Sequence, residues 1–370
     1  MINPLKWNGI MKNAALVLVI LLMIFFSFTF FSCTGEQTNA DKSIVRIETE
    51  SDNLSNILRK TEEMPYLKSL IILKNGEVIV EEYFNGGGPD QIHDIRSASK
   101  SILSAVLGIA IKDKYIESID QRVIDFFPEY ITDELDPKLY DLRIRHLITM
   151  KSGFKVKETA KVYQKLYESS DWVEHILHLP FQSEPGKKFN YHSFNTHLLS
   201  ATISKATGMS TLEYAKSSLF SPLGIIEVKW DKDPVGYHIG GWGLSLKAQD
   251  MLKFGILYLN NGLFKGTQVV PSEWIKSSII ERTGMIGTYY SGWNKSYGYG
   301  FLWWVKRINN HIDIPFAMGH GGQRIAIIPD VNAVLVTQAE PNPEPSTSFK
   351  RHRSVDPLLF DDFASYLLDW

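Results

Sequence analysis

Residues 95–103 read Ile-Arg-Ser-Ala-Ser-Lys-Ser-Ile-Leu, and the apolar run from Ile102 to Ile111 overlaps their end. Apolar residues recur in this run at helical intervals, so we expect a buried helix from about Ser97 to Ile111. Ser97 would then lie in the first turn, with Lys100 three residues later on the same face. A Lys can take the proton of a Ser hydroxyl when desolvation lowers its pKa, and free N–H groups at a helix N-terminus can hold an oxyanion. The stretch is therefore typical of a nucleophile and its base.

The tetrapeptide Ser97-x-x-Lys100 also has a plainer interpretation, an N-capping Ser followed by a solvated Lys. Its surroundings favour the interpretation as a nucleophile and its base. Lys100 is followed by an apolar helix, and two further candidate segments lie downstream in the chain.

The second segment, residues 185–193, reads Pro-Gly-Lys-Lys-Phe-Asn-Tyr-His-Ser and precedes an expected helix that starts near His197. Its Tyr191 could act as a general base if a nearby cation stabilised the phenolate, because the ordinary pKa of about 10 is too high. Lys100 could supply that charge. A Tyr that only packs at a loop–helix junction is the alternative.

The third segment, residues 318–323, reads Met-Gly-His-Gly-Gly-Gln and precedes an expected strand from Arg324. Glycines around His320 would let a substrate backbone approach a strand edge closely. They would also free a backbone N–H, such as that of Gln323, to face an oxyanion. A Gly-rich turn with an incidental His is the alternative.

The first 33 residues are expected to form a signal peptide. Two lysines precede the apolar run from Ala14 to Phe31, and Ser32-Cys33 follows it. This junction resembles a bacterial lipobox, in which Cys33, the only cysteine in the chain, would be lipidated and become the mature N-terminus. An uncleaved anchor is the alternative, since the run is about long enough to span a bilayer. Either reading tethers a domain outside the cytoplasm, and we favour an exported, membrane-anchored lipoprotein that faces the periplasm or the cell exterior.

After a polar linker at residues 34–45, the remaining roughly 330 residues exceed the usual length of one domain. Residues 68–84 read as a β-hairpin, because Asn75-Gly76 between apolar runs is a strong hairpin signal. Strand character returns at residues 297–308, 325–329 and 333–339.

These patterns predict an α+β fold, in which an antiparallel sheet of five or more strands is flanked by helices. The sheet subdomain would comprise residues 46–115 and 290–370, and a helical subdomain would be inserted at residues 116–289.

Composition argues against two classes of protein. The net charge is −2 and no basic cluster stands out, so we expect no nucleic-acid partner. The 10 histidines show no ligand spacing, so we expect neither a metal nor another cofactor. The sequence does not fix the oligomeric state.

Taken in order, the three motifs Ser97-x-x-Lys100, Tyr191-x-Ser193 and His320-Gly321-Gly322 resemble those of the serine β-lactamase and DD-peptidase superfamily. The chain is most similar to class C β-lactamases, the related esterases and the 6-aminohexanoate-dimer hydrolases. Residues 147–153, 240–244 and 297–301 also match stretches typical of these proteins, so the resemblance covers about residues 50–370. It implies a β-lactamase/transpeptidase-like fold.

The resemblance also implies roles for individual residues. Ser97 would attack an acyl carbonyl, Lys100 would take or share its proton, and Tyr191 would return a proton to the leaving group. The backbone N–H groups of Ser97 and Gln323 would form the oxyanion hole, and water would finally cleave the acyl-enzyme. The implied substrate-binding residues are Ser193, His320, Gly321 and Gly322.

Two positions depart from the pattern of the superfamily. Ser193 stands where the second motif usually has Asn, and His320 stands where many penicillin-recognising members carry Lys. Both changes favour an ester or amide of a small acyl substrate over a β-lactam. A DD-carboxypeptidase or weak β-lactamase is the alternative enzyme, and a non-catalytic ligand-binding protein is the alternative class, which the intact Ser97, Lys100 and Tyr191 disfavour.

Overall fold

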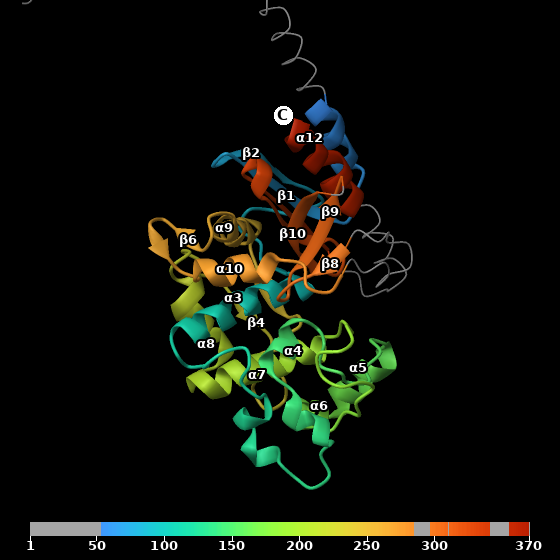
Figure 1. Cartoon of the computed structure of the whole chain (residues 1–370). Helices are drawn as coiled ribbons and strands as arrows, with labels where there is room; N and C mark the ends of the chain where they lie inside the picture. The colour runs from blue at the N-terminus through green and yellow to red at the C-terminus, as the bar shows by residue number, and fades with distance from the viewer. Residues whose placement is uncertain (1–52, 285–296, 310, 341–354, 370) are drawn as a thin grey trace, which may run out of the picture. The chain divides into compact units, whose positions relative to one another are not determined.

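The computed structural model describes residues 53–284, 297–309, 311–340 and 355–369 (Figure 1). The expected signal peptide with its lipobox and the expected linker lie outside these residues. Asp52–Trp370 forms one compact unit. In the part of the chain that is described, no helix has both the length and the apolar character needed to cross a membrane.

A seven-stranded antiparallel sheet organises this unit, which confirms the predicted α+β fold. Its strand order is β2-β1-β12-β11-β10-β9-β8. Because β12 pairs with β1, strands from the two ends of the unit lie side by side. The strands are β1 (Leu67–Lys74), β2 (Glu77–Tyr83), β8 (Tyr297–Tyr299), β9 (Trp304–Ile308), β10 (Ile312–Gly319), β11 (Gln323–Ile328) and β12 (Ala333–Ala339).

The predicted hairpin is confirmed. Asn75 and Gly76 connect β1 and β2 with φ of 51° and 84°, the left-handed conformations that a tight hairpin turn needs. The region 297–308, expected as one strand, is two strands, because the chain turns at residues 300–303 between β8 and β9. β10 was not expected, since Asp313 and Pro315 weaken its strand signal.

Both faces of the sheet are covered. On one face α9 (Ala248–Leu259) packs so closely that a Cβ on its Gly255 would meet Ile325 of β11. Successive residues of a strand point to opposite faces, so Ala326 and its partner Phe316 point away from α9. Phe316 packs edge-to-face on Phe360 of the C-terminal helix at 4.9 Å between ring centroids. The sheet therefore lies between α9 and the C-terminal helix.

Most helices lie between β2 and β8 in the chain. The expected bounds of the helical subdomain are untested and stay a prediction. The helix α5 (Ala160–Glu168) was not predicted from the sequence. The other short strands are β3 (His93–Asp94), β4 (Lys229–Trp230), β5 (Leu244–Leu246), β6 (Leu263–Phe264) and β7 (Thr267–Gln268). The helices are one over residues 53–62, α3 (Ser99–Lys112), α4 (Ile144–Ile148), α5 (Ala160–Glu168), α6 (Trp172–Leu177), α7 (Ser193–Thr207), α8 (Thr211–Ala215), α10 (Ser272–Ile279) and α12 (Ala364–Asp369), with π-helical turns at Lys216–Phe220 and Leu358–Phe363.

A buried ion pair joins the sheet to the C-terminal segment. Arg324 of β11 is fully buried, and its Nε and Nη2 lie 2.8 Å and 2.6 Å from Oδ1 of Asp356. Its Nη1 donates to the carbonyl oxygens of Gly319 and Gln323, each at 2.9 Å. Burial raises the pKa of Asp356, and the Arg324 charge opposes that shift. One guanidinium thus fixes both ends of the β10–β11 turn.

We expect Asp356→Asn to lower the free energy of unfolding by about 3–5 kcal/mol, because it removes the charge of the buried carboxylate that the Arg324 guanidinium contacts. The matched control is Asp313→Asn, which breaks a partly exposed pair with Arg307 and should cost about 0–1 kcal/mol. Urea denaturation of both variants measures the difference. Equal losses would show that Asp356 does not hold β11.

Candidate active site

Ser97 lies in a short 3₁₀ turn, Arg96–Ala98, between β3 and α3. The helix itself begins at Ser99, two residues later than expected, because Arg96 has a left-handed φ of 52°. Asp94 Oδ1 holds this conformation by accepting the Arg96 N–H at 2.7 Å. The same oxygen accepts the Gly243 N–H at 3.2 Å. Asp94 therefore connects the turn that carries Ser97 to the loop that begins at Gly240.

Lys100 is the centre of the site. Its Nζ lies 2.8 Å from Ser97 Oγ, 3.0 Å from Ser193 Oγ and 2.9 Å from the Gly241 carbonyl oxygen. A charged ammonium can donate one hydrogen to each of these oxygens. A neutral amine has two hydrogens and a lone pair, so it can accept the Ser97 proton while it donates to Ser193 and Gly241. The geometry suits a base for Ser97.

The environment of Lys100 increases the fraction of the side chain that is neutral. The side chain is 1% exposed, and this burial lowers its pKa to about 8, while the negative charge of Glu158 acts in the opposite direction. At pH 7 about one Lys100 in ten is then neutral. An ordinary solvated lysine would be almost entirely charged at that pH.

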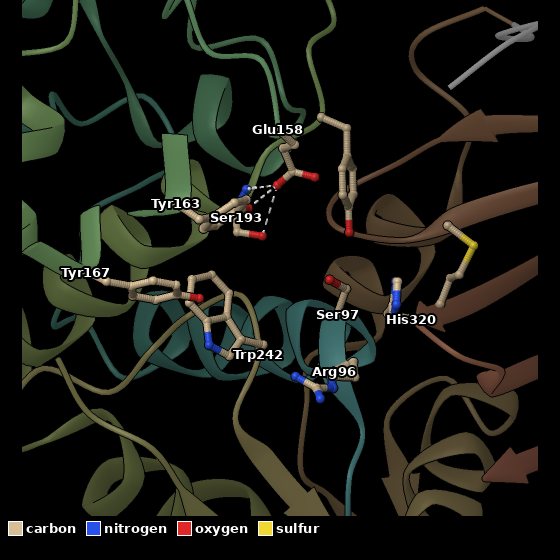
Figure 2. Close-up of a pocket in the computed structure, with 10 residues that line it drawn as sticks. Arg96, Ser97, Glu158, Tyr163, Tyr167, Ser193, Trp242 and His320 are labelled. Carbon is tan, nitrogen blue, oxygen red and sulfur yellow. Dashed lines mark hydrogen bonds between the residues drawn. The ribbon is translucent and has the colours of Figure 1, made fainter. Parts of the chain in front are cut away.

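Glu158 was not predicted from the sequence. Its Oε1 accepts the backbone N–H of Ser193 at 2.9 Å and the Ser193 hydroxyl at 3.3 Å. The hydroxyl of Tyr163 donates to the same oxygen. Figure 2 shows the Glu158–Ser193 contacts facing Ser97 across the pocket. Ser193 thus donates to Glu158 and accepts from Lys100, which fixes the direction of its hydroxyl.

Tyr191 lies beside Lys100, as the second motif requires. Its ring centroid is 5.1 Å from Lys100 Nζ. The ring is buried and packs against Tyr299 and Trp304, at 6.0 Å and 5.4 Å between centroids. Tyr191 and Ser97 line one pocket. The structure therefore brings the predicted nucleophile, amine and phenol together, and the role of each stays a prediction.

The residue after Tyr191 is a buried neutral histidine. Burial, and then the Lys100 charge, lower the pKa of His192 to about 3. Its Nε2 lies 3.4 Å from Ser152 Oγ, in the stretch 147–153 that resembles the superfamily. At neutral pH His192 adds no charge beside Lys100.

The third motif packs against the segment that leads to Ser97. Gly321 and Gly322 have left-handed φ of 85° and 114°. A Cβ on Gly319 would lie 2.1 Å from the Ile95 carbonyl oxygen, so no side chain fits there. The side chain of Gln323 bonds to the backbone of Ala339 on β12, which anchors the start of β11.

The pocket in front of Ser97 has a volume of about 260 Å³. The predicted site residues that line it are Ser97, Tyr191, Ser193 and His320. Lys100 is not among the lining residues but contacts Ser97. Gly321, Gly322 and Gln323 are not among the lining residues, so the oxyanion hole and the glycine contacts stay predictions. Within the described part of the chain, the lining residues are Arg96, Ser97, Glu158, Tyr163, Tyr167, Tyr191, Ser193, Trp242, Met318 and His320.

Comparison with known proteins agrees with this arrangement. Residues 68–356 match the family described as Beta-lactamase. The chain belongs to the beta-lactamase family. The resemblance expected from the three motifs is thereby confirmed.

Several relatives of this beta-lactamase family member are recognisable. A 6-aminohexanoate-dimer hydrolase from Paenarthrobacter ureafaciens is 24% identical over 316 residues, which cover 81% of this chain and 79% of that protein. A solved structure from Bacillus anthracis, named provisionally as a 6-aminohexanoate-dimer hydrolase, is 20% identical with a TM-score of 0.67 and covers 82% of this chain and 80% of its own. An octameric penicillin-binding protein homologue from Pyrococcus abyssi is 19% identical with a TM-score of 0.62, at 84% and 77% coverage. At these identities the two structures establish the fold alone.

In this beta-lactamase family member the charge of Glu158 raises the pKa of Lys100. A base must be neutral to take a proton, so kcat/KM should rise with pH through the Lys100 pKa. Glu158→Gln keeps an acceptor oxygen for Ser193 but removes the charge, which destabilises the ammonium. We expect the acidic limb of the pH–rate profile to move to lower pH.

The control for this shift is Glu174→Gln, which removes an exposed carboxylate from α6 and should leave the limb unchanged. Two groups near Lys100 do not account for the limb: His192 is neutral above about pH 3, and burial raises the pKa of Tyr163 well above its ordinary value. A limb that stays in place or moves upward in Glu158→Gln would mean that Lys100 is not the group that titrates.

Proposed function

We propose that the protein is a serine hydrolase that cleaves an ester or amide bond of a small acyl substrate through an acyl-enzyme on Ser97. The observation that carries this proposal is the contact of Lys100, in the first turn of the buried helix α3, with Ser97 and Ser193. A binding protein has no need of a desolvated amine against a serine hydroxyl. Family membership supports hydrolysis, and one relative is named for hydrolysing a dimer of 6-aminohexanoate.

The reaction would begin with neutral Lys100. Its lone pair takes the Ser97 proton as Ser97 Oγ attacks the acyl carbon, and the carbonyl oxygen becomes an oxyanion that faces backbone N–H groups of Ser97 and Gln323. The Tyr191 hydroxyl donates its proton to the leaving alcohol or amine as the acyl–heteroatom bond breaks. Lys100 can return the proton it took to the Tyr191 phenolate.

The second half of the reaction would use water. A water molecule gives its proton to the same Lys100–Tyr191 pair and attacks the acyl carbon, and the bond to Ser97 Oγ breaks as Ser97 regains its proton. Free acid leaves the pocket. Such covalent catalysis divides one difficult acyl transfer into two easier steps.

The pocket suggests the kind of substrate. At about 260 Å³ it lies just below the usual range of about 300–1,000 Å³ for ligand pockets, which favours a small acyl group. Tyr167 and Trp242 provide aromatic walls (Figure 2). His320, in the place of a lysine, carries a charge only when protonated, so it favours substrates without an obligatory carboxylate.

We also propose that the enzyme acts at the cell envelope, tethered through a lipid on Cys33. The basis is the sequence alone, since an apolar run ends at a Ser-Cys junction.

The primary test is covalent labelling of Ser97. A fluorophosphonate probe should label the wild-type protein and fail to label Ser97→Ala, with the modified peptide located by mass spectrometry. Ser99→Ala is the matched control, because Ser99 is a neighbouring buried serine that makes no contact with Lys100 among the described hydrogen bonds. Labelling that persists in Ser97→Ala would refute the proposal, and labelling of Ser97 by a penicillin probe would favour the penicillin-recognising alternative instead.

The role of Tyr191 gives an independent prediction. Tyr191→Phe keeps the ring packing but removes the hydroxyl, so kcat on a short amide, whose leaving amine must be protonated, should fall about 10²–10⁴-fold, the usual contribution of general acid–base catalysis. Tyr167→Phe, at the edge of the same pocket, should change kcat only a few-fold. If Tyr191→Phe retains nearly full activity, another group transfers the proton.

A further inference from the structure

A second cavity is lined in part by Gly186, which belongs to the segment that leads to Tyr191. It has a volume of about 450 Å³ and shares no lining residue with the pocket in front of Ser97. Two backbone hydrogen bonds, from Gly186 N–H to the Lys151 oxygen and from Asn190 N–H to the Met150 oxygen, both 2.7 Å, hold this segment in place. The described residues that line it are Ile119, Arg145, His146, Thr149, Lys151, Gly186, Arg282 and Phe301.

The charge of this cavity is of one sign. Among the described residues, its lining includes three cationic side chains, Arg145, Lys151 and Arg282, and no carboxylate. Arg145 forms an ion pair with Asp120. The Lys151 side chain donates to the backbone carbonyl oxygen of Arg282, and the Arg282 side chain donates to the carbonyl oxygen of Ser277. In the described part of the chain, neither side chain forms an ion pair with a carboxylate. The charges of Lys151 and Arg282 repel one another, and a bound anion would relieve that repulsion.

Arg282 is held in a fixed position. Its Nε and Nη2 donate to the Ser277 carbonyl oxygen at 3.3 Å and 2.8 Å, and its guanidinium lies 4.2 Å from the centre of the Phe301 ring. Burial lowers the pKa of Arg282. A guanidinium fixed on an aromatic ring loses little freedom when it binds an anion.

His146 contributes a neutral donor. Its Nδ1 accepts the backbone N–H of Arg143 at 3.1 Å, so the neutral ring carries its proton on Nε2. Burial, together with Arg145 and Arg143, lowers the pKa of His146 to about 4. A Cβ on Gly186 would lie 3.2 Å from Nε2, so the glycine leaves this donor uncovered.

We propose that this cavity binds a small organic anion, whose carboxylate or phosphate group is held by Lys151, Arg282 and the Nε2–H of His146. Ile119 and Phe301 provide apolar walls for the rest of the molecule. The volume lies within the range of small-molecule sites. The inference does not depend on the chemistry proposed for Ser97, since the two sites share no residue.

The test is isothermal titration calorimetry of the protein at low ionic strength and pH 7, with benzoate and phenyl phosphate as probes and benzyl alcohol as their neutral counterpart. We expect at least one anion to bind and the alcohol not to bind. Lys151→Gln and Arg282→Gln should each weaken binding about tenfold, because a charge-assisted hydrogen bond is lost. The anion that binds more tightly identifies the head group.

Two control variants locate the binding. Lys155→Gln removes an exposed charge four residues from Lys151 and should leave the affinity unchanged. Arg96→Gln should also leave it unchanged, since Arg96 lines the other pocket. Absence of binding, binding lost only in Arg96→Gln, or equal losses in Lys151→Gln and Lys155→Gln would each overturn the proposal. If Arg282→Gln proves unstable by thermal melting, Lys151→Gln decides the matter, because its side chain is partly exposed.

Discussion

The removal of one amine from water is the constraint on which the rest of the structure depends. Lys100 lies inside the fold because α3 is buried on all sides between the sheet and the other helices. An ammonium in such a place is costly unless every hydrogen finds an acceptor. The fold supplies three acceptors from three distant parts of the chain, namely Ser97, Ser193 and Gly241. The same burial that makes the ammonium costly lowers the pKa of Lys100, so the amine is neutral often enough to take a proton.

The acceptors are held by connections that lie outside the motifs. Asp94 ties the Ser97 turn to the glycine-rich loop, and Glu158 ties Ser193 to the far wall of the pocket. Close approaches that only glycine permits complete the arrangement. A Cβ on Gly241 would lie 2.6 Å from Ser193 Cβ and 3.4 Å from Lys100 Nζ. The loop can therefore reach the amine only because residue 241 has no side chain.

The sequence revealed those parts of the site whose chemistry is local. Ser97 and Lys100 lie three residues apart at the start of an apolar helix, so their pattern can be recognised from the sequence alone. The three motifs in order indicated the family. Glu158 could not be found in this way, because it precedes a short helix with one buried residue, Leu166, and acts on a serine 35 residues away. The Arg324 guanidinium was equally hidden, since its partner lies 32 residues later in the chain. Long-range polar contacts between common residue types produce no periodic pattern in the sequence by which they could be recognised.

The ion pair between Arg324 and Asp356 has a consequence for biosynthesis. The ribosome adds Asp356 long after Ser97 and Lys100. A nascent chain that stops before β12 lacks the strand that pairs with β1 over nearly their full length, and it also lacks the carboxylate that contacts Arg324. The candidate site can therefore assemble only after β12 and Asp356 have been synthesised, so a shorter nascent chain carries the serine and the lysine without a formed pocket.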